Sequence, residues 1–213
     1  GMRFGIAALI LVWFVPIPRG YLVKLCFIAL VSATIQYGLT FSGLARMDAT
    51  PAILLVQSEV IFGVVIGAIL LGEKPDLRQI LGIIIALAGI MILIGGPALT
   101  NKMTGIVLVL SGCFTWAFGQ VLIRKFTSGL SGFQLTAWVG VMASPQMFLA
   151  SFFVEGNPVP FLTAAPLSAW GTVIYLGVVM TVVGYSAWYY VLGRYPVPIV
   201  MPLQMLLPVS TIL

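Results

Sequence analysis

One acidic side chain, Glu59, lies in the middle of a long apolar stretch, nine residues beyond Thr50. A charged residue at a membrane-helix centre costs roughly 2.5 to 3.5 kcal/mol on insertion scales, and it usually faces a bundle interior or a wet cavity. Gly63 and Gly67 follow at spacings of four, so Glu59 shares a helix face with small residues that allow close packing. We interpret Glu59 as a functional carboxyl group that exchanges a proton. The alternative is a protonated carboxyl group that only hydrogen-bonds a neighbouring helix.

Two glutamines accompany this carboxyl group. Gln57 lies about 200° round the helix from Glu59, so the two side chains cannot share a face. Gln204 occupies a position related to Gln57 by an internal repeat that is described below. Both alternatives stay open for Gln57, a site residue or a polar contact that holds helices together.

Further polar and aromatic side chains recur at helical spacing inside the apolar segments. An aromatic stripe is more often lipid-facing or core than functional, and one near a segment end can anchor the helix at the membrane interface. Buried amides are different, because they need hydrogen-bond partners. The candidates for substrate binding or translocation beside Glu59, Gln57 and Gln204 are Gln36, Tyr37, Trp116, Gln120, Tyr185 and Trp188.

Several kinds of chemistry are disfavoured by what the chain lacks. It has no histidine, which removes the commonest metal ligand and general base. Cys26 and Cys113 lie in apolar runs without a CxxC partner and are interpreted as small core residues. No HExxH, GxSxG or pair of intramembrane aspartates is present, so an intramembrane enzyme is the weaker alternative. We expect no metal, no cofactor and no nucleic-acid partner.

The elements that position these residues are membrane helices. The composition is 61% hydrophobic and 7% charged, with a mean hydropathy of +1.17, whereas ordinary globular domains carry about 25% charged residues. Apolar runs near 20 residues without alternation predict an all-α, polytopic transmembrane helix bundle. The predicted segments are residues 4–16, 25–44, 50–71, 79–97, 104–123, 133–154, 169–192 and 197–213.

The positive charges in the turns between these segments predict the orientation of the chain. Successive turns lie on alternate sides of the membrane, and Lys and Arg accumulate on the cytoplasmic side. One side has seven such residues and the other has two, Arg46 and Lys102. The seven are Arg19, Lys24, Lys74, Arg78, Arg124, Lys125 and Arg194, and their side is predicted to be cytoplasmic.

An internal repeat relates the two halves of the chain. An offset of 148 residues places Val31 on Val179 and Tyr37 on Tyr185, and one further residue of slip places Gln57 on Gln204. The related segments lie five helices apart, and an odd number forces opposite orientations, as in the inverted repeats of secondary transporters. We therefore expect two inverted five-helix repeats, residues 1–97 without their first helix and 104–213 without their last. The chain would then be an internal fragment, with about eight of ten helices.

Residues 44–93 form the most distinctive part of the sequence. An apolar helix ends there at Leu71-Gly72-Glu73, and a polar turn leads to Gly82 and Ala88-Gly89. The second half carries Trp116 and Gln120, then Gly184-Tyr185, Trp188 and the run 192–196, Leu-Gly-Arg-Tyr-Pro. Over nearly its whole length the chain resembles the EamA family of the drug/metabolite transporter superfamily, with details closest to amino-acid and metabolite exporters. Glu73 matches a family motif and is interpreted as structural.

The resemblance and the repeat together predict a function. They imply a secondary-active transporter of the inner cell membrane that exports small polar metabolites, such as amino acids or their derivatives, by alternating access. Coupling to protons is one option. The alternatives are uptake or exchange of another solute, such as a drug or nucleotide sugar. Expected partners are the metabolite and the lipid bilayer, and a homodimer is one oligomeric state left open.

Overall fold

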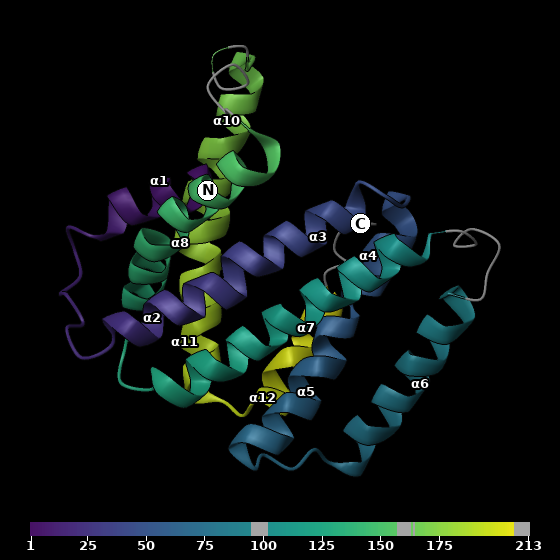
Figure 1. The fold of residues 1–213 in the computed structure, drawn as a ribbon. Coiled ribbons are helices and arrows are strands. Elements are labelled where there is room, and N and C mark those ends of the chain that lie inside the picture. Colours follow the sequence, from purple (N-terminus) through teal and green to yellow (C-terminus); the bar gives the residue numbers. More distant parts are fainter. Residues whose placement is uncertain (95–101, 157–162, 164, 207–213) are drawn as a thin grey trace. The chain divides into compact units, whose positions relative to one another are not determined.

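The computed structural model describes residues 1–94, 102–156, 163 and 165–206 (Figure 1). Each of the eight predicted apolar segments contains helix, and no strand occurs among the described residues. The predicted all-α class is therefore confirmed. The contacts divide the chain into two compact units, residues 1–34 with 126–194 and residues 35–125 with 195–213.

The first unit is built around α8, a helix that begins with a capping box at Ser131. Three segments pack on α8: α1, α2 and the helix that ends the unit. In Figure 1, α10, η3 and α11 follow one another in a continuous column. The bounds are α1 Met2–Leu11, α2 Leu22–Ala29, the π-helix η1 Leu30–Ile35, α8 Gly132–Glu155, α10 Leu167–Tyr175, the π-helix η3 Leu176–Tyr185 and α11 Ser186–Arg194.

The second unit contains most of the predicted site residues. Its bounds are α3 Gln36–Leu44, α4 Ala49–Val56, α5 Ser58–Leu71, α6 Leu77–Ile94, α7 Met103–Phe126, α12 Val197–Val200 and the 3₁₀-helix η4 Met201–Leu206. A buried apolar cluster of α7 with α4 and the α3–α4 turn forms its core: Met47, Ala52, Leu55, Ile106, Val109 and Cys113. Each compact unit takes segments from both halves of the sequence, and the division into repeats at 1–97 and 104–213 stays a prediction.

The outer surface of the chain is suited to lipid. Among the described residues, five helices are long and apolar enough to cross a membrane, namely 22–44, 51–71, 103–126, 132–153 and 167–194. Large apolar side chains cover their outsides, for example Val23 at 84% exposure and Leu167 at 87%. Such a surface is unsuited to water, and helices satisfy their own backbone groups in hydrocarbon. The chain is a multi-pass membrane protein.

Small residues mark the places where helices cross in the first unit. A Cβ atom on Gly132 of α8 would lie 2.2 Å from the Ser186 carbonyl oxygen of α11. One on Gly140 would lie 2.9 Å from the Phe4 carbonyl oxygen of α1. Membrane helices have no hydrophobic drive to associate, so close backbone approach supplies the packing energy. Ser186 Oγ also donates a 3.0 Å hydrogen bond to Thr136 Oγ1 at this crossing.

The second unit uses the same kind of contact. A Cβ atom on Gly112 of α7 would lie 2.3 Å from Thr40 Oγ1 of α3. On α5, the Gly63-xxx-Gly67 pair faces the last segment: a Cβ atom on Gly63 would lie 2.8 Å from Met201 Cε, and one on Gly67 3.1 Å from Val197 Cγ1. The predicted small-residue face of α5 is therefore a real packing face, and its partner is α12 with η4.

Two π-helices interrupt the long membrane segments of the chain. Wide i→i+5 turns are rare and often lie near functional sites. With the 148-residue offset, η1 at 30–35 corresponds to 178–183, which falls inside η3 at 176–185. Thr181 Oγ1 accordingly donates to the carbonyl oxygen of Leu176, five residues earlier, at 2.8 Å. The same irregularity thus occurs at positions related by the 148-residue offset, and the repeat stays a prediction.

Candidate functional site

The segment that carries Glu59 is broken near its middle. Within the span 51–71, α4 ends at Val56 and α5 begins at Ser58. The Gln57 N–H donates to the Leu54 carbonyl oxygen at 3.2 Å, three residues back, and the Val60 N–H donates to that of Gln57 at 3.2 Å. In a continuous helix, each carbonyl group accepts from the N–H group four residues later. This tight turn leaves carbonyl groups of α4 without that donor.

A thiol from another helix lies against the break. Cys113 Sγ of α7 lies 3.8 Å from the Leu55 carbonyl oxygen and 3.9 Å from that of Val56, where the S–H donates weakly. Such a side-chain insertion is a recognised cause of a helix kink. Cys113 is fully buried, as predicted, but it has this polar role beside its packing role. The same prediction for Cys26 is wrong, because Cys26 lies on the exposed side of α2.

The next residue, Ser58, has a side chain that needs an explanation. Ser58 is 3% exposed, and its Oγ makes no hydrogen bond of normal geometry among the described residues, although the weakly polar Cys113 thiol lies beside it. A buried hydroxyl group without a partner costs about 1 to 3 kcal/mol. Glu59 follows in the first turn of α5 and is half-buried. The break therefore presents a hydroxyl group and a carboxyl group together, in the middle of the span.

Helix geometry predicts that Glu59 and Gln204 lie on the sides of α5 and η4 that face each other. Gly63 of α5 contacts Met201 of η4, and Glu59 lies one α-helical turn before Gly63 on the same face. In a 3₁₀-helix, residues three apart eclipse each other, so Gln204 lies directly above Met201. Both side chains are half-buried.

Gln36 and Tyr37 begin α3, and the structure gives them different surroundings. Gln36 is 5% exposed and donates from Nε2 to Thr40 Oγ1 at 3.2 Å, while its Oε1 has no partner among the described residues. Its carbonyl oxygen lies where α3 crosses α7 at Gly112. Tyr37 is half-buried and stacks on Phe41, with ring centroids 5.6 Å apart.

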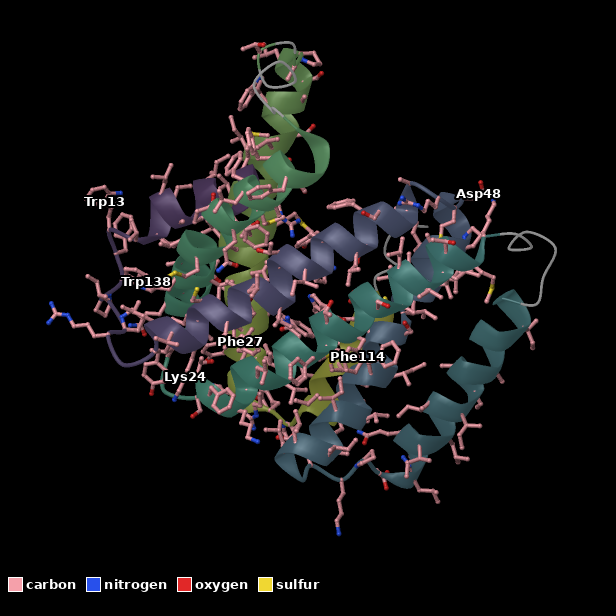
Figure 2. The ribbon with its side chains drawn as sticks, in the orientation of Figure 1. Trp13, Lys24, Phe27, Asp48, Phe114 and Trp138 are labelled. Atoms are coloured by element: carbon pink, nitrogen blue, oxygen red, sulfur yellow. The ribbon has the colours of Figure 1, made fainter. Side chains whose placement is uncertain are left out.

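The two candidates on α7, Trp116 and Gln120, are both buried, at 6% and 1% exposure. They lie one turn apart on one face. Neighbouring Phe114, labelled in Figure 2, points the other way and meets Phe62 of α5 edge-on, with centroids 5.7 Å apart. Trp116 and Gln120 are therefore buried on a different face of α7 from Phe114.

Tyr185 and Trp188 belong to the first unit. Tyr185 lies in an aromatic cluster with Tyr189 and Phe4, at centroid distances of 5.6 and 6.2 Å. The guanidinium group of Arg3 lies 5.8 Å from the Tyr185 ring centroid and 4.8 Å from that of Phe4. A cation over these rings gains a cation–π attraction that strengthens away from water. Trp188 is half-buried on α11.

Seven of the nine predicted residues thus lie in the second unit. Five of the seven are on α3, α7 and η4, and the other two, Gln57 and Glu59, are at the break of the third segment. Gln57 is half-buried at the turn itself. Among the described residues, no three His, Cys, Asp or Glu side chains gather where they could hold a metal ion.

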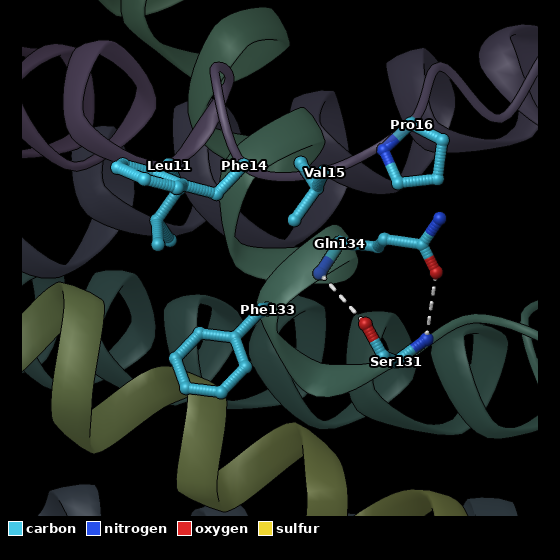
Figure 3. Close-up of a pocket in the computed structure, with 7 residues that line it drawn as sticks. All are labelled: Leu11, Phe14, Val15, Pro16, Ser131, Phe133 and Gln134. Carbon is cyan, nitrogen blue, oxygen red and sulfur yellow. Dashed lines mark hydrogen bonds between the residues drawn. The ribbon is translucent and has the colours of Figure 1, made fainter.

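A separate pocket of about 490 Å³ lies in the first unit, in the turn after α1 (Figure 3). The reciprocal hydrogen bonds between Ser131 and Gln134 form its floor, and the rest is apolar: Leu11, Phe14, Val15, Pro16 and Phe133. Trp138 Nε1 fastens this turn by donating to the Pro16 carbonyl oxygen at 3.2 Å. Trp13, 82% exposed, points outward (Figure 2). None of the predicted site residues lines this pocket.

Three polar residues inside the membrane segments were missed by the sequence reasoning as functional candidates: Ser58, Cys113 and Gln146. Gln146 Nε2 donates to the Cys26 carbonyl oxygen at 3.2 Å, and its Oε1 accepts from Thr34 Oγ1 at 3.1 Å, so it ties α8 to α2 and η1. An amide in mid-segment beside Pro145 was a usable signal. For Ser58, the only signal in the sequence was its position next to Glu59.

The fold and the break define a multi-pass helical membrane protein with polar groups at mid-span. The profile of the EamA-like transporter family matches residues 1–95 and 103–213. The chain belongs to the EamA-like transporter family, and this confirms the resemblance seen in the sequence.

Named relatives agree with this family. The chain is 30% identical over 218 residues to a probable amino-acid metabolite efflux pump of Escherichia coli K12, covering 98% of this chain and 73% of that protein. It is 28% identical to a protein of the same description from Salmonella typhimurium LT2, with the same coverage. An uncharacterized transporter of Bacillus subtilis is 26% identical, over 87% of this chain and 65% of that protein. No solved structure matches the chain.

Proposed function

We propose that the protein is a secondary-active transporter of the inner cell membrane that exports small polar metabolites, such as amino acids or their derivatives, by alternating access. One observation carries this proposal: the helix of the third segment is interrupted by a tight turn at Gln57, with the buried Ser58 hydroxyl group and the Glu59 carboxyl group directly beside it. Broken membrane helices whose freed backbone groups line a cavity are typical substrate and ion sites in secondary transporters. The printed names of the two enterobacterial relatives support the amino-acid class.

The chemistry of the break suits a ligand with hydrogen-bond donors. At the break, Glu59 offers carboxylate oxygens and Ser58 a hydroxyl group, and on α3 Gln36 offers an unpartnered amide oxygen. These are mostly acceptors, and a substrate ammonium group provides donors and a positive charge. Gln204, opposite Glu59, can both donate and accept. An amino acid or amine-bearing derivative is therefore the substrate class that these groups favour.

A proton is the proposed coupling partner. Glu59 would release a proton when substrate ammonium binds and take one up when the empty carrier returns. The alternatives are an uniporter or an exchanger of another solute, in which Glu59 stays in one protonation state throughout.

Counterflow in proteoliposomes tests the proposal, with a panel of labelled amino acids and measurements between about pH 5.5 and 8. Glu59→Gln keeps size and hydrogen bonding but cannot exchange a proton, so the variant should insert normally and lose the pH dependence of transport. Glu59→Ala should lose more, because neighbouring polar groups also lose a partner. Gln57→Ala, on another face, is the milder control. Wild-type rates and an unchanged pH profile in Glu59→Gln would rule out the proton hypothesis.

A further inference from the structure

The last described segment begins with an unusual proline pattern, Pro196, Pro198 and Pro202. Prolines 196 and 198 have no N–H, so Val197 carries the single backbone donor of residues 196–198. Proline 202 also has no N–H, and it stands four residues after Pro198, where a helical donor to the Pro198 carbonyl group belongs. The sequence of α12 therefore creates one backbone donor and one acceptor that the helix itself cannot satisfy.

Two side chains of another part of the chain satisfy these two groups. Glu73 Oε2, just after α5, accepts from the Val197 N–H at 2.6 Å. Gln79 Nε2, in the first turn of α6, donates to the Pro198 carbonyl oxygen at 3.1 Å. We call this pair of contacts the clasp. It joins the start of α12 to the turn between α5 and α6, 124 and 119 residues away in sequence.

The clasp is reinforced from α7. Glu73 Oε1 lies 3.5 Å from Arg124 Nε, and both side chains are only about one-fifth exposed, at 19% and 21%. Lys125 Nζ donates to the Leu70 carbonyl oxygen at 3.2 Å, near the end of α5. Gln79 is held in turn, because its Oε1 accepts from the Asp76 N–H at 2.8 Å. Four elements, α5, α6, α7 and α12, thus meet at the end of the unit that carries Lys74, Arg78, Arg124 and Lys125.

We propose that the clasp acts as a latch at the predicted cytoplasmic end. Glu73 and Gln79 hold α12 and η4 closed on α5, and the latch releases when the carrier opens to the cytoplasm. This proposal rests on the proposed function. The segment that the clasp holds is the one that carries Gln204, opposite Glu59. Below the clasp, the contact of α5 with this segment consists of glycines against Val197 and Met201, which can separate without breaking a polar bond.

The test uses the full-length protein with Cys26 and Cys113 replaced by Ala and one reporter cysteine at a time. Met201→Cys places the reporter on the closed face, since Met201 is fully buried against Gly63. Val109→Cys places a control reporter in the buried core of the same unit, far along α7 from Arg124. Inside-out vesicles expose the cytoplasmic side to an impermeant maleimide.

Glu73→Ala should raise the labelling rate at Met201→Cys by about tenfold, because losing one charge-assisted hydrogen bond shifts an opening equilibrium by roughly that factor. The rate at Val109→Cys should not change. Glu73→Gln can still accept from Val197 but loses the ionic contact, so its effect should be intermediate, and it replaces the Ala variant if that one does not insert. Asp76→Asn removes an equal charge from the same turn without touching α12 and should have no effect.

Gln79→Ala should act in the same direction. In a Pro202→Ala background its effect should shrink, because residue 202 then supplies an N–H to the Pro198 carbonyl group. Equal increases at Met201→Cys and Val109→Cys would show that Glu73 only stabilises the fold, and unchanged labelling at both would also overturn the latch. Labelling needs no substrate, so it tests the latch separately from the proposed function. If the wild-type protein fails in counterflow, the proposed function is overturned, whereas the labelling rates still decide whether the latch exists.

Discussion

At the scale of single residues, a substitution of Ser58 distinguishes a role in substrate binding from a role in folding better than a substitution of Glu59 does. The Ser58 hydroxyl group is buried beside the break, and it makes no hydrogen bond of normal geometry among the described residues. A group that costs free energy in the empty protein is useful only if something binds it at another moment of the cycle. Removing it should therefore weaken substrate binding without weakening the fold.

The prediction is that Ser58→Ala keeps or slightly raises the melting temperature in detergent, while the half-saturating substrate concentration rises about three- to tenfold, the worth of one hydrogen bond. Ser186→Ala is the matched control. Its hydroxyl group is equally buried but bonded to Thr136 at 3.0 Å, so stability should fall by about 1 kcal/mol. A Ser58→Ala variant that melts earlier and binds normally would contradict the assignment.

The candidate residues were predictable from the sequence one by one, but most of their relations were not. Glu59 stands out because a charge in an apolar run is costly. The expectation that it lies on the side of α5 facing Gln204 depends on the register of Gly63 with Met201, which comes from distant parts of the sequence and is visible only in the fold. Glu73 was interpreted as structural. Its contact with Val197 was not predicted, because the two residues are 124 positions apart and nothing in the sequence around Glu73 indicates the contact.

At the scale of elements, the segments were predictable because hydropathy determines them. The predicted run 50–71 matches α4 and α5, and 104–123 matches most of α7. The break of the run 50–71 at Gln57 was not foreseen, and the Cys113 thiol that lies against it comes from another helix. The predicted first segment, 4–16, is longer than α1, which ends at Leu11.

Helix crossings give a sharp test of packing. Gly112→Ala should destabilise the protein by about 1 to 3 kcal/mol, the usual cost of overpacking, because its Cβ atom would meet Thr40 Oγ1 at 2.3 Å and the Thr40 backbone nitrogen at 3.2 Å. Gly171→Ala on α10, with nothing within 4 Å, should be neutral or slightly stabilising. Thermal melting in detergent measures both. Equal melting temperatures for the two variants would mean that the α3–α7 crossing is looser than described.

At the scale of the whole molecule, the charge bias predicts which side faces the cytoplasm. In the background without native cysteines, Asp48→Cys, in the α3–α4 turn, should react from outside with an impermeant maleimide in intact cells. Asp76→Cys, in the α5–α6 turn, should react only after the membrane is opened. Both positions are exposed aspartates in the structure. The reverse pattern would invert the orientation and place the clasp on the outer side.

The π-helix η3 has a consequence for the fit between protein and membrane. The element 167–194 has 28 residues, which as a regular α-helix would extend about 42 Å, well beyond a hydrocarbon core of about 30 Å. Ten of these residues form η3, and a wider coil rises less per residue. The wide turns therefore shorten the longest element toward bilayer thickness, and any rewinding of them into α-helix would lengthen it again. We therefore expect the winding of this helix to respond to acyl-chain length, with a thicker bilayer favouring the α-helical form and a thinner one the π-helical form.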